Sequence, residues 1–490
     1  MINRFNFFII LIVTSFAFAE KAPGLTQSTK SVLVDDSKAQ LTTQTKIDDD
    51  TSEALKKGNS LEFSYKNLSY LQSSDDATSS EQVFQIREEY NFKSLKHAVH
   101  AELLFGGYKG KNFVFGAVPE IYYQYTSISD VKISNVFTFG RKAINISESD
   151  QVFNLGLVNP YFTQDFLSFQ KQGLVGFHYE LDTQYWGGGL SALPIYLPNQ
   201  GPSVQEKNGK IEGSNRWVNK PPAEFAFNDN NKEIIYSINY NEVTKLAFSP
   251  GAIVYGRLGQ VDNQVHLMTS YSRKPMNEPV LERETFADIN VVGNVNLVPQ
   301  VLYDDLYTAD LRFKNKSIKS SIAYISDQPQ NKIARNFYSI QTLKPISGIT
   351  ASIDYSLQTN TKNNFILGFS MGAFSGGEIL DLNSDGTENI FTFKKQRLQY
   401  KMPIQISFSS DLLSFGTKVV NTNFKWLNDR LQKGSVFSTE LNIKSESQTG
   451  LKGHLGFDVL GTEDQKSEDF GFIQQFQAND RVYGGLDYVF

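Results

Sequence analysis

The sequence predicts an all-β fold: a closed, transmembrane antiparallel β-barrel with a polar lumen and one or two long inserted loops. Three observations support this prediction. The N-terminus is typical of exported proteins, apolar residues recur every second position along most of the chain, and the composition is polar on average yet rich in aromatic residues. The 490 residues are enough for one large barrel.

Residues 1–19 are expected to be a secretory signal peptide. Arg4 supplies a positive charge, an apolar run follows from Phe5 to Phe16, and Ala17 and Ala19 form an A-x-A cleavage site. The apolar run is shorter than the roughly 20 residues that cross a bilayer as a helix. We therefore expect Sec-type export followed by removal of this segment.

The composition excludes several functional classes. Because the chain has no cysteine, it forms no disulfide, uses no catalytic thiolate and holds no cysteine-bound metal. Its mild net charge of −5 argues against a nucleic-acid partner, which requires a concentrated basic surface. Aromatic residues make up 13% and charged residues 20% of the chain. A barrel explains this mixture, because lipid-facing and water-facing residues alternate and aromatic residues gather at the two interfaces.

Residues 20–59 are expected to be a flexible polar segment in the periplasm. They are rich in Thr, Ser, Gln, Lys and Asp, and they include the acidic run Asp48–Asp50. Such a segment buries too little apolar surface to offset the entropy lost on ordering. The barrel is therefore expected to occupy residues 60–490.

The barrel prediction rests on alternation in segments bounded by Gly, Asn, Asp and Pro. Residues 349–358 show it most clearly, with the apolar residues Ile349, Ala351, Ile353, Tyr355 and Leu357 separated by polar ones. Residues 307–314, 437–444 and 451–459 repeat the pattern. Weaker segments include 233–241, 286–296, 335–343 and 390–400. Together they predict about 18 strands, within a range of about 16 to 20 for a barrel of even strand number.

Alternation also fits a soluble β-sandwich or β-helix. The polar faces here, however, carry both signs of charge at strand centres, while the apolar faces are rich in Phe, Tyr, Leu and Ile. A water-filled lumen accommodates the first face and lipid requires the second, which favours the barrel. The candidate lumen charges, expected to set ion preference, are Asp310, Arg312, Lys314, Asp354, Glu440, Lys444 and Asp458.

Two insertions, 141–172 and 193–232, are too long and irregular for tight turns. The first is rich in Phe and Leu, so we expect it to fold into the lumen and narrow it, with one helical turn near 163–169. The second carries five prolines and several basic residues, and we expect it to line or shield the mouth of the barrel. A surface loop packed on the rim is the alternative for both.

The last eight residues, 483–490, place Gly485, Tyr488 and Phe490 in a characteristic spacing. This spacing resembles the terminal strand of Gram-negative outer-membrane β-barrel proteins, which have a glycine, a hydrophobic residue three positions later and an aromatic residue at the end. The resemblance is to this porin-like architectural class and to no specific family. It implies recognition by the barrel assembly machinery and closure of the last strand on the first.

Residues 381–389 carry oxygen-bearing side chains at Asp381, Asn383, Asp385 and Asn389, with Gly386 between them. This spacing resembles the start of an EF-hand-like calcium loop. Thr392 stands where a bidentate Glu is expected, and no helices flank the loop. Calcium is therefore the candidate ligand, and a solvated turn between two strands is the alternative. We expect no other cofactor.

An outer-membrane enzyme would be indicated by suitably placed histidines, and the chain has five: His97, His100, His178, His266 and His454. His97 and His100 are three residues apart, which on a strand places them on opposite faces. His266 precedes Ser270 and Ser272, but no G-x-S-x-G elbow occurs. We therefore expect the chain not to be an enzyme, and a hydrolase remains the second alternative.

The combined features predict an outer-membrane channel for passive or weakly selective passage of small hydrophilic solutes. The first alternative is a surface receptor, an adhesin or a channel for polymer export that uses the insertions as binding surfaces. The expected location is the outer membrane of a Gram-negative bacterium. Expected partners are outer-membrane lipid, lipopolysaccharide, the barrel assembly machinery and small solutes, and the sequence leaves the oligomeric state open.

Overall fold

The computed structural model describes most of residues 56–490. The residues in this range that lie outside the description are 73–78, 110–112, 129–132, 203, 214, 219–223, 228–229, 239–246, 261–264, 279, 288–292, 331–333, 336–339, 361–362, 383–394, 415–417, 446–448 and 463–470. The described residues belong to one compact unit. The expected signal peptide, residues 1–19, lies outside the described residues, as does the expected polar segment up to residue 55.

Eighteen strand positions form one closed antiparallel barrel, in which each strand pairs with its neighbour along the chain. In ring order they are β1 (Lys56–Tyr70), β2 (Ser80–Lys93), β3 (His97–Tyr108), β4 (Val114–Ala117) with β5 (Ile121–Ile128), β6 (Ser134–Lys142), β9 (Leu174–Asp182), β10 (Trp186–Ile195), β15 (Gly251–Gly259), β16 (Val265–Pro275), β19 (Tyr303–Lys314), β20 (Ile318–Pro329), β23 (Ile346–Asn360), β24 (Asn363–Ser375), β27 (Pro403–Ser414), β28 (Lys418–Asp429), β29 (Gly434–Ser445), β30 (Gly450–Thr462) and β31 (Arg481–Val489). The strands β4 and β5 pair with successive parts of β3 and therefore share one position.

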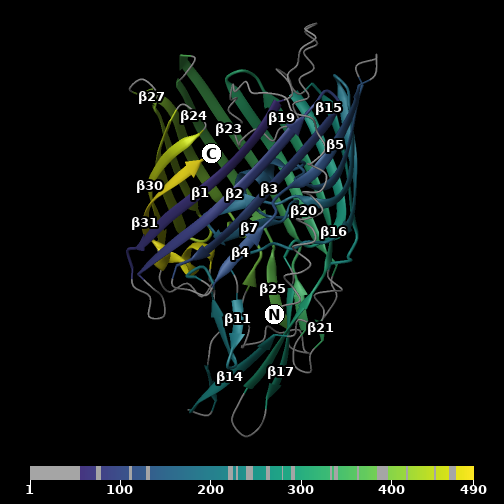
Figure 1. Cartoon of the computed structure of the whole chain (residues 1–490). Helices are drawn as coiled ribbons and strands as arrows, with labels where there is room; N and C mark the ends of the chain where they lie inside the picture. The colour runs from purple at the N-terminus through teal and green to yellow at the C-terminus, as the bar shows by residue number, and fades with distance from the viewer. Residues whose placement is uncertain are drawn as a thin grey trace, which may run out of the picture. The chain divides into compact units, whose positions relative to one another are not determined.

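The ring closes between its first and last strands. β31 pairs with β1 from Tyr70 opposite Arg481 to Glu62 opposite Val489, and the two strands lie side by side in Figure 1. Closure leaves no unpaired sheet edge in the wall, which is the condition for a β-structure to stand in hydrocarbon. The predicted closed antiparallel barrel of about 18 strands is confirmed.

Side chains alternate between the two faces of the wall. On β23, Ile349, Ile353 and Tyr355 are exposed on the outside, whereas Thr350 between them is buried on the inside. On β19, Tyr307 and Leu311 face outward, and the intervening Thr308 and Asp310 face inward. An exposed outer face of aromatic and aliphatic residues is the pattern of a barrel that contacts lipid.

The two ends of the barrel differ in the length of their connections. We call the end where β1 begins and β31 finishes the terminal end, and the opposite end the loop end. The terminal end has the connections 94–96, 129–133, 183–185, 260–264, 315–317, 361–362, 415–417 and 446–449. The loop end has 71–79, 109–113, 143–173, 196–250, 276–302, 330–345, 376–402, 430–433 and 463–480. Among the described residues, the strands and helices outside the wall therefore lie in the loop-end connections.

The loop-end connections form small sheets of their own (Figure 1). These are a β7–β8 hairpin (Tyr161–Asp165, Ser168–Lys171), a β11–β12 hairpin (Val204–Lys207, Lys210–Gly213), a sheet of β13 (Glu224–Phe227), β14 (Asn230–Ile238), β18 (Gly293–Gln300) and β17 (Val280–Ala287), and a sheet of β21 (Ala334–Arg335), β22 (Ile340–Leu343), β25 (Glu378–Leu382) and β26 (Lys395–Gln396). The last two sheets each join strands from two different connections, and β14 runs parallel to β18.

These sheets correct part of the strand assignment. The described strand residues of 233–241, 286–296, 335–343 and 390–400 belong to the loop-end sheets and not to the wall, and in the last segment only 395–396 form a strand, with 397–400 irregular. Alternation with a period of two shows only that a strand has one apolar face and one polar face. A strand that pairs with a neighbouring connection meets this condition as well as a strand of the barrel wall does.

Helical structure in the described residues is confined to α2 (Glu148–Phe153), α4 (Phe472–Gln475) and the 3₁₀ turn η2 (Gln477–Asn479). The helical turn predicted near 163–169 is wrong, because those residues form the β7–β8 hairpin. Among the described helices, none combines the length and hydropathy needed to cross a bilayer.

The terminal residues pack on the seam of the barrel. The Phe490 ring lies 5.7 Å from that of Phe63 on β1 and 4.6 Å from that of Tyr488. Gly485 faces the lumen, and a Cβ there would lie only 2.2 Å from the Tyr65 carbonyl oxygen. A side chain at this position would therefore push β31 away from β1.

Candidate functional site in the barrel lumen

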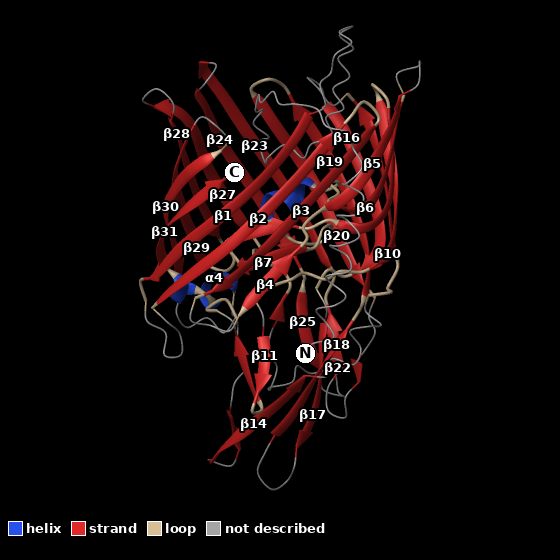
Figure 2. Cartoon of the chain, viewed as in Figure 1, coloured by secondary structure: helices blue, strands red, loops and turns tan. Residues whose placement is uncertain are grey.

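Residues 143–173, which we call the plug segment, leave β6 at the loop end and enter the lumen before returning to β9. The segment contains α2, which lies inside the ring of strands in Figure 2. Ser147 caps α2 by accepting a hydrogen bond from the Asp150 amide at 3.3 Å, and Asn154 ends it in the left-handed conformation at a φ of 49°. The acidic residues Glu148 and Asp150 lie in the first turn, where the helix dipole favours negative charge.

Glu148 fixes the start of α2 to the inner wall. Its carboxylate lies 2.7 Å from Lys319 Nζ on β20 and 3.6 Å from Arg312 Nε on β19. Its backbone amide donates to Asp310 Oδ2 at 2.7 Å, and Arg312 also pairs with Asp310 at 2.6 Å. Burial alone would raise the pKa of Glu148, but the positive charges of Arg312 and Lys319 lower it overall. The cluster therefore favours an ionised Glu148.

Neutral hydrogen bonds attach α2 to two further points of the wall. Ser149 Oγ lies 2.8 Å from Thr350 Oγ1 on β23, and Thr308 Oγ1 on β19 donates to the Ile146 carbonyl at 2.9 Å. Within the plug segment, the Asp150 carboxylate accepts the Leu157 amide at 2.8 Å. Burial raises the pKa of Asp150, because this carboxylate is removed from water.

Apolar side chains fill the lumen around and beyond α2, toward the loop end. The plug segment contributes Ile144, Ile146, Phe153, Leu155, Leu157 and Val158. The wall contributes inward-facing Leu193, Ile253, Tyr255, Met268, Leu306, Ile325, Ile346, Phe374, Leu427, Val436 and Leu460 to the same cluster. Burying one such side chain is worth about 1.5–3 kcal/mol. The docked plug segment is therefore a packed core and not a loosely placed loop.

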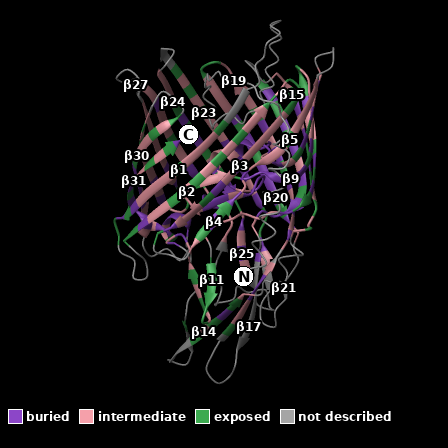
Figure 3. Cartoon of the chain, in the orientation of Figure 1, coloured by how far each residue is buried: buried purple, intermediate pink, exposed green. Residues whose placement is uncertain are grey.

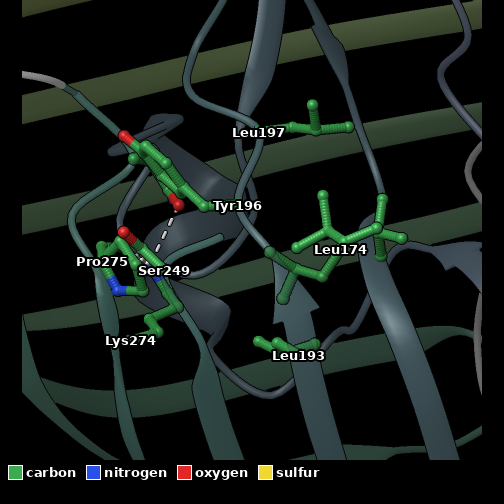
Figure 4. A pocket seen from close by; sticks show the side chains of 11 residues that line it. Leu174, Leu193, Tyr196, Leu197, Ser249, Lys274 and Pro275 are labelled. Carbon is green, nitrogen blue, oxygen red and sulfur yellow. Dashed lines mark hydrogen bonds between the residues drawn. The ribbon is translucent and has the colours of Figure 1, made fainter. Parts of the chain in front are cut away.

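Further apolar packing joins the plug segment to the wall. A second cluster joins Leu104, Tyr108, Phe115 and Ala117 of the wall to Phe162 of the plug segment. Figure 3 shows buried residues gathered where the inserted segments meet the wall. The crevice beside Leu174, Leu193 and Tyr196, drawn in Figure 4, has a volume of about 10 Å³, which is the space of one water molecule.

The second insertion also reaches the plug segment. Trp217 is buried, with its ring 5.2 Å from Phe476 and 6.0 Å from Phe166. Asn215 Nδ2 donates to the Gln164 carbonyl at 2.6 Å. Residues of the second insertion, which we expected to line or shield the mouth of the barrel, therefore pack against the segment that enters the lumen.

The predicted lumen charges fall into two groups. Asp310 and Asp458 are not exposed to a pore but fully buried, Asp310 against α2 and Arg312, and Asp458 against Arg481 at 2.7 Å. Arg312 contacts the plug segment. The other four are partly buried at inward-facing positions nearer the terminal end: Lys314, Asp354, Glu440 and Lys444. These four line what we call the vestibule, the part of the lumen between the plug segment and the terminal end.

The proposed calcium loop lies almost entirely outside the described residues. Asp381 belongs to β25, opposite Gln341, whereas Asn383, Asp385 and Asn389 are not described. Within the part of the chain that the structure describes, no group of three or more His, Asp or Glu side chains is arranged to hold a metal ion.

The histidines occupy separate places in the wall. His97 Nδ1 lies 2.6 Å from the Tyr123 hydroxyl, and His100 Nδ1 lies 2.6 Å from Asn91 Oδ1 on the opposite face. His178 Nδ1 lies 2.9 Å from Ser191 Oγ. Both side chains of this serine–histidine pair are buried.

Sequence reasoning missed Glu148, Lys319, Ser149 and Thr350 as parts of the site. A local signal was available for α2, because the S-x-x-D spacing of Ser147 and Asp150 is a helix-capping pattern. No local signal indicated that Lys319 on a distant strand would receive Glu148.

Comparisons with known proteins show similarity of fold only. No protein-family model and no curated protein matches the chain. Among solved structures, the chain is similar to Wzi, an outer-membrane protein of Escherichia coli involved in group 1 capsule assembly. The sequence identity is 7%, the match covers 87% of this chain and 83% of Wzi, and the TM-score is 0.40. It is also similar to OpdQ of Pseudomonas aeruginosa, with 10% identity, coverage of 89% and 96%, and a TM-score of 0.43. For OmpT of Vibrio cholerae, an outer-membrane protein, the identity is 8%, the coverage 90% and 98%, and the TM-score 0.38. At these values the similarities assign no function to this chain.

Proposed function

We propose that this protein is an outer-membrane channel for small hydrophilic solutes whose plug segment acts as a gate. The observation that carries the proposal is the docking of α2 across the lumen by Glu148, Ser149 and an apolar core. The docked form is the closed state, and weakly selective passage requires the plug segment to move. This role involves no enzymatic chemistry.

The membrane placement is supported by the outer face of the wall. Exposed aromatic and aliphatic residues alternate with inward polar ones on strand after strand, as lipid on one side and water on the other require. Bacterial barrels have short periplasmic turns and longer extracellular loops. By this rule the terminal end faces the periplasm, and the loop end with its small sheets faces the outside of a Gram-negative cell. Lipopolysaccharide is then the neighbour of the loop end, and the barrel assembly machinery is the partner for insertion.

Planar-bilayer recordings test the gate. One variant replaces residues 144–158 with a Gly-Ser stretch of equal length, and its matched control replaces 204–213, the exposed β11–β12 hairpin, in the same way. We expect the first variant to show large, steady conductance, and the wild type and the control to remain mostly closed. If the first variant still migrates as a folded, heat-modifiable barrel but passes no current, the channel function is wrong.

A reversible lock provides a second test. Because the chain has no cysteine, the pair Ser149→Cys and Thr350→Cys introduces a single disulfide between α2 and β23, whose side-chain oxygens are 2.8 Å apart. Oxidation is expected to abolish spontaneous openings and reduction to restore them. Each single variant serves as a control, since it cannot form the bond.

One observation favours a second candidate function, that of a surface receptor. β14 and β18 come from different connections, yet pair over five residues from Ile234 opposite Gly293 to Ile238 opposite Leu297. Such cross-connection pairing gives the loop end a preformed surface. Deleting 194–231 distinguishes the two functions, because a channel keeps or gains conductance, whereas a receptor loses cell-surface ligand binding and shows no change in current.

A further inference from the structure

We propose that Arg312 and Lys319 form a binding site for the carboxylate of a small organic acid, and that Glu148 of the plug segment occupies this site as a built-in competitor. The two cations of this site belong to strands of the barrel wall. The consequence of the site for transport rests on the proposed function as a gated channel. A solute carboxylate that takes the place of Glu148 releases α2.

The geometry around Glu148 is that of a bound carboxylate. Two cations on neighbouring strands converge on it, with Lys319 Nζ at 2.7 Å and Arg312 Nε at 3.6 Å. Arg312 is held in place independently by Asp310 on its own strand at 2.6 Å. Since Asp310 does not leave with the plug segment, the guanidinium remains positioned when Glu148 departs. Guanidinium and ammonium groups held in this way are the usual partners of carboxylates.

The two cations are more accessible than the carboxylate that they bind. The side chain of Glu148 is 3% exposed, whereas those of Arg312 and Lys319 are 15% and 37% exposed. Lys314, two residues beyond Arg312 on the same inward row, continues the basic face toward the terminal end. A solute in the vestibule therefore meets Lys319 before α2 has moved, which allows direct competition.

The charge balance favours an anionic replacement. With Glu148 docked, its carboxylate faces both Arg312 and Lys319, while Asp310 pairs with Arg312, and Asp354 interacts with Lys319 from the neighbouring strand. Removal of Glu148 takes away the carboxylate that faces both cations in this partly buried site, which is unfavourable without a compensating anion. A neutral solute cannot compensate this charge.

The wall also offers hydroxyl groups to the replacing ligand. Thr308 donates to the Ile146 carbonyl and Thr350 bonds to Ser149, so both hydroxyls lose a plug-segment partner when α2 leaves. The two hydroxyls lie on β19 and β23, the strands on either side of β20, which carries Lys319. A short carboxylate, with or without a hydroxyl group, therefore fits the chemistry of the vacated site.

The test measures release of α2 directly and does not depend on conductance. Ser149 is fully buried, and Ser149→Cys places the only thiol of the chain at this position. In detergent, a maleimide labels this thiol only when α2 is undocked, so the labelling rate reports the undocked population. The probes are sodium acetate and, at the same concentration, its neutral isostere acetamide, with sodium chloride holding the ionic strength constant. We expect acetate to accelerate labelling by about threefold or more, because a ligand that binds one state shifts the equilibrium by mass action. Acetamide should have no effect.

Three charge variants in the Ser149→Cys background complete the test. Glu148→Gln should raise the basal rate by about tenfold or more, because a partner of a buried ion pair is lost, and should remove the acetate response. Lys319→Gln should also weaken the acetate response. Lys452→Gln alters an inward lysine on β30 that pairs with Glu62 at 3.9 Å, outside the cluster, and should leave both the basal rate and the response unchanged. The proposal is overturned if acetamide acts like acetate, if acetate has no effect, or if the acetate response survives Glu148→Gln. If instead the variant in which residues 144–158 are replaced conducts no current in bilayers, the proposed channel function is wrong, but the proposed carboxylate site is not affected.

Discussion

Arg481, the first residue of the last strand, forms an ion pair with Asp165 of the plug segment, and Nη2 and Oδ2 are 2.5 Å apart. The same guanidinium pairs with Asp458 on β30 at 2.6 Å and lies 5.7 Å from the Trp217 ring. The plug segment, the second insertion and the closing seam of the barrel therefore meet at one buried cation. The full docking site for the plug segment exists only after β31 has closed the ring.

This junction predicts that Asp165→Asn loosens the plug segment without opening the wall. Arg481 keeps Asp458, so the seam is preserved, whereas a charge-assisted hydrogen bond worth about 1.5–3 kcal/mol to plug docking is lost. Spontaneous openings in bilayers should become more frequent, with no change in heat-modifiable migration. Glu212→Gln breaks an exposed pair with Lys207 and is the control expected to have no effect. Unchanged opening frequency in Asp165→Asn would contradict a role for the junction in gating.

Acidification is predicted to open the channel. In the docked state, burial acts to raise the pKa of Glu148, but Arg312 and Lys319 outweigh it and lower that pKa. The contribution of Glu148 to docking is therefore complete above the ordinary carboxyl pKa and is lost as the pH falls through the lowered pKa. Burial raises the pKa of Asp150, so its contribution has the opposite sign and declines as the pH rises through its own raised value. The other titratable groups that interact with Glu148 are Asp310, Lys171, His266 and Asp354.

The check is the open probability between about pH 7 and pH 3. In the wild type, the open probability should rise at the acidic end of this range. In Glu148→Gln, the open probability should already be high at neutral pH and should depend much less on pH. If Glu148→Gln keeps the same acid-induced opening, another group is responsible for it.

The closed barrel could be predicted because its signals are local and repeated. Ile349 to Leu357 places one kind of residue on each face within a single strand, and a similar pattern recurs around the ring. Each repetition adds evidence independently, since the pleat has a period of two whatever a strand pairs with. The same property explains the error at 233–241, where alternation gave the strand but could not distinguish the wall from a loop-end sheet.

The site could not be predicted at the same level because it is built from contacts distant in sequence. Glu148 and Lys319 are 171 positions apart, and Ser149 and Thr350 are 201 apart. The sequence showed that Asp310 was an inward charge, but its burial depends on α2, which reaches it from another connection. The apolar composition of the first insertion indicated that it would enter the lumen, and its capping residues show where a helix starts. Which wall residues receive that helix follows only from the order and register of the strands.

Removal of the terminal aromatic is predicted to impair assembly. Phe490 packs on Phe63 across the seam, and its spacing from Gly485 and Tyr488 resembles the assembly signal of outer-membrane barrels. Phe490→Ala should reduce the amount of heat-modifiable protein in the outer membrane several-fold. Phe457→Ala removes a similar outward ring from β30, away from the chain end, and should leave the yield unchanged. Equal losses in both variants would indicate general destabilisation and not a terminal signal.

The apolar half of the plug is predicted to hold the gate as strongly as the ion pairs. Phe153, at the end of α2, is buried edge-on against Phe374 of β24, with ring centroids 5.8 Å apart. Phe153→Ala leaves Glu148, Ser149 and their partners intact but creates a cavity, at a cost of about 3–5 kcal/mol. Because the wall strands do not depend on this ring, most of that cost should fall on docking of the plug segment. We expect persistent conductance in bilayers and faster labelling of Ser149→Cys in the double variant. The matched control is Phe365→Ala, which truncates an outward ring on the same strand as Phe374 and should alter neither measurement. If Phe153→Ala stays closed while its thermal stability falls, the apolar core supports the barrel as a whole and the polar contacts of α2 alone keep the lumen shut.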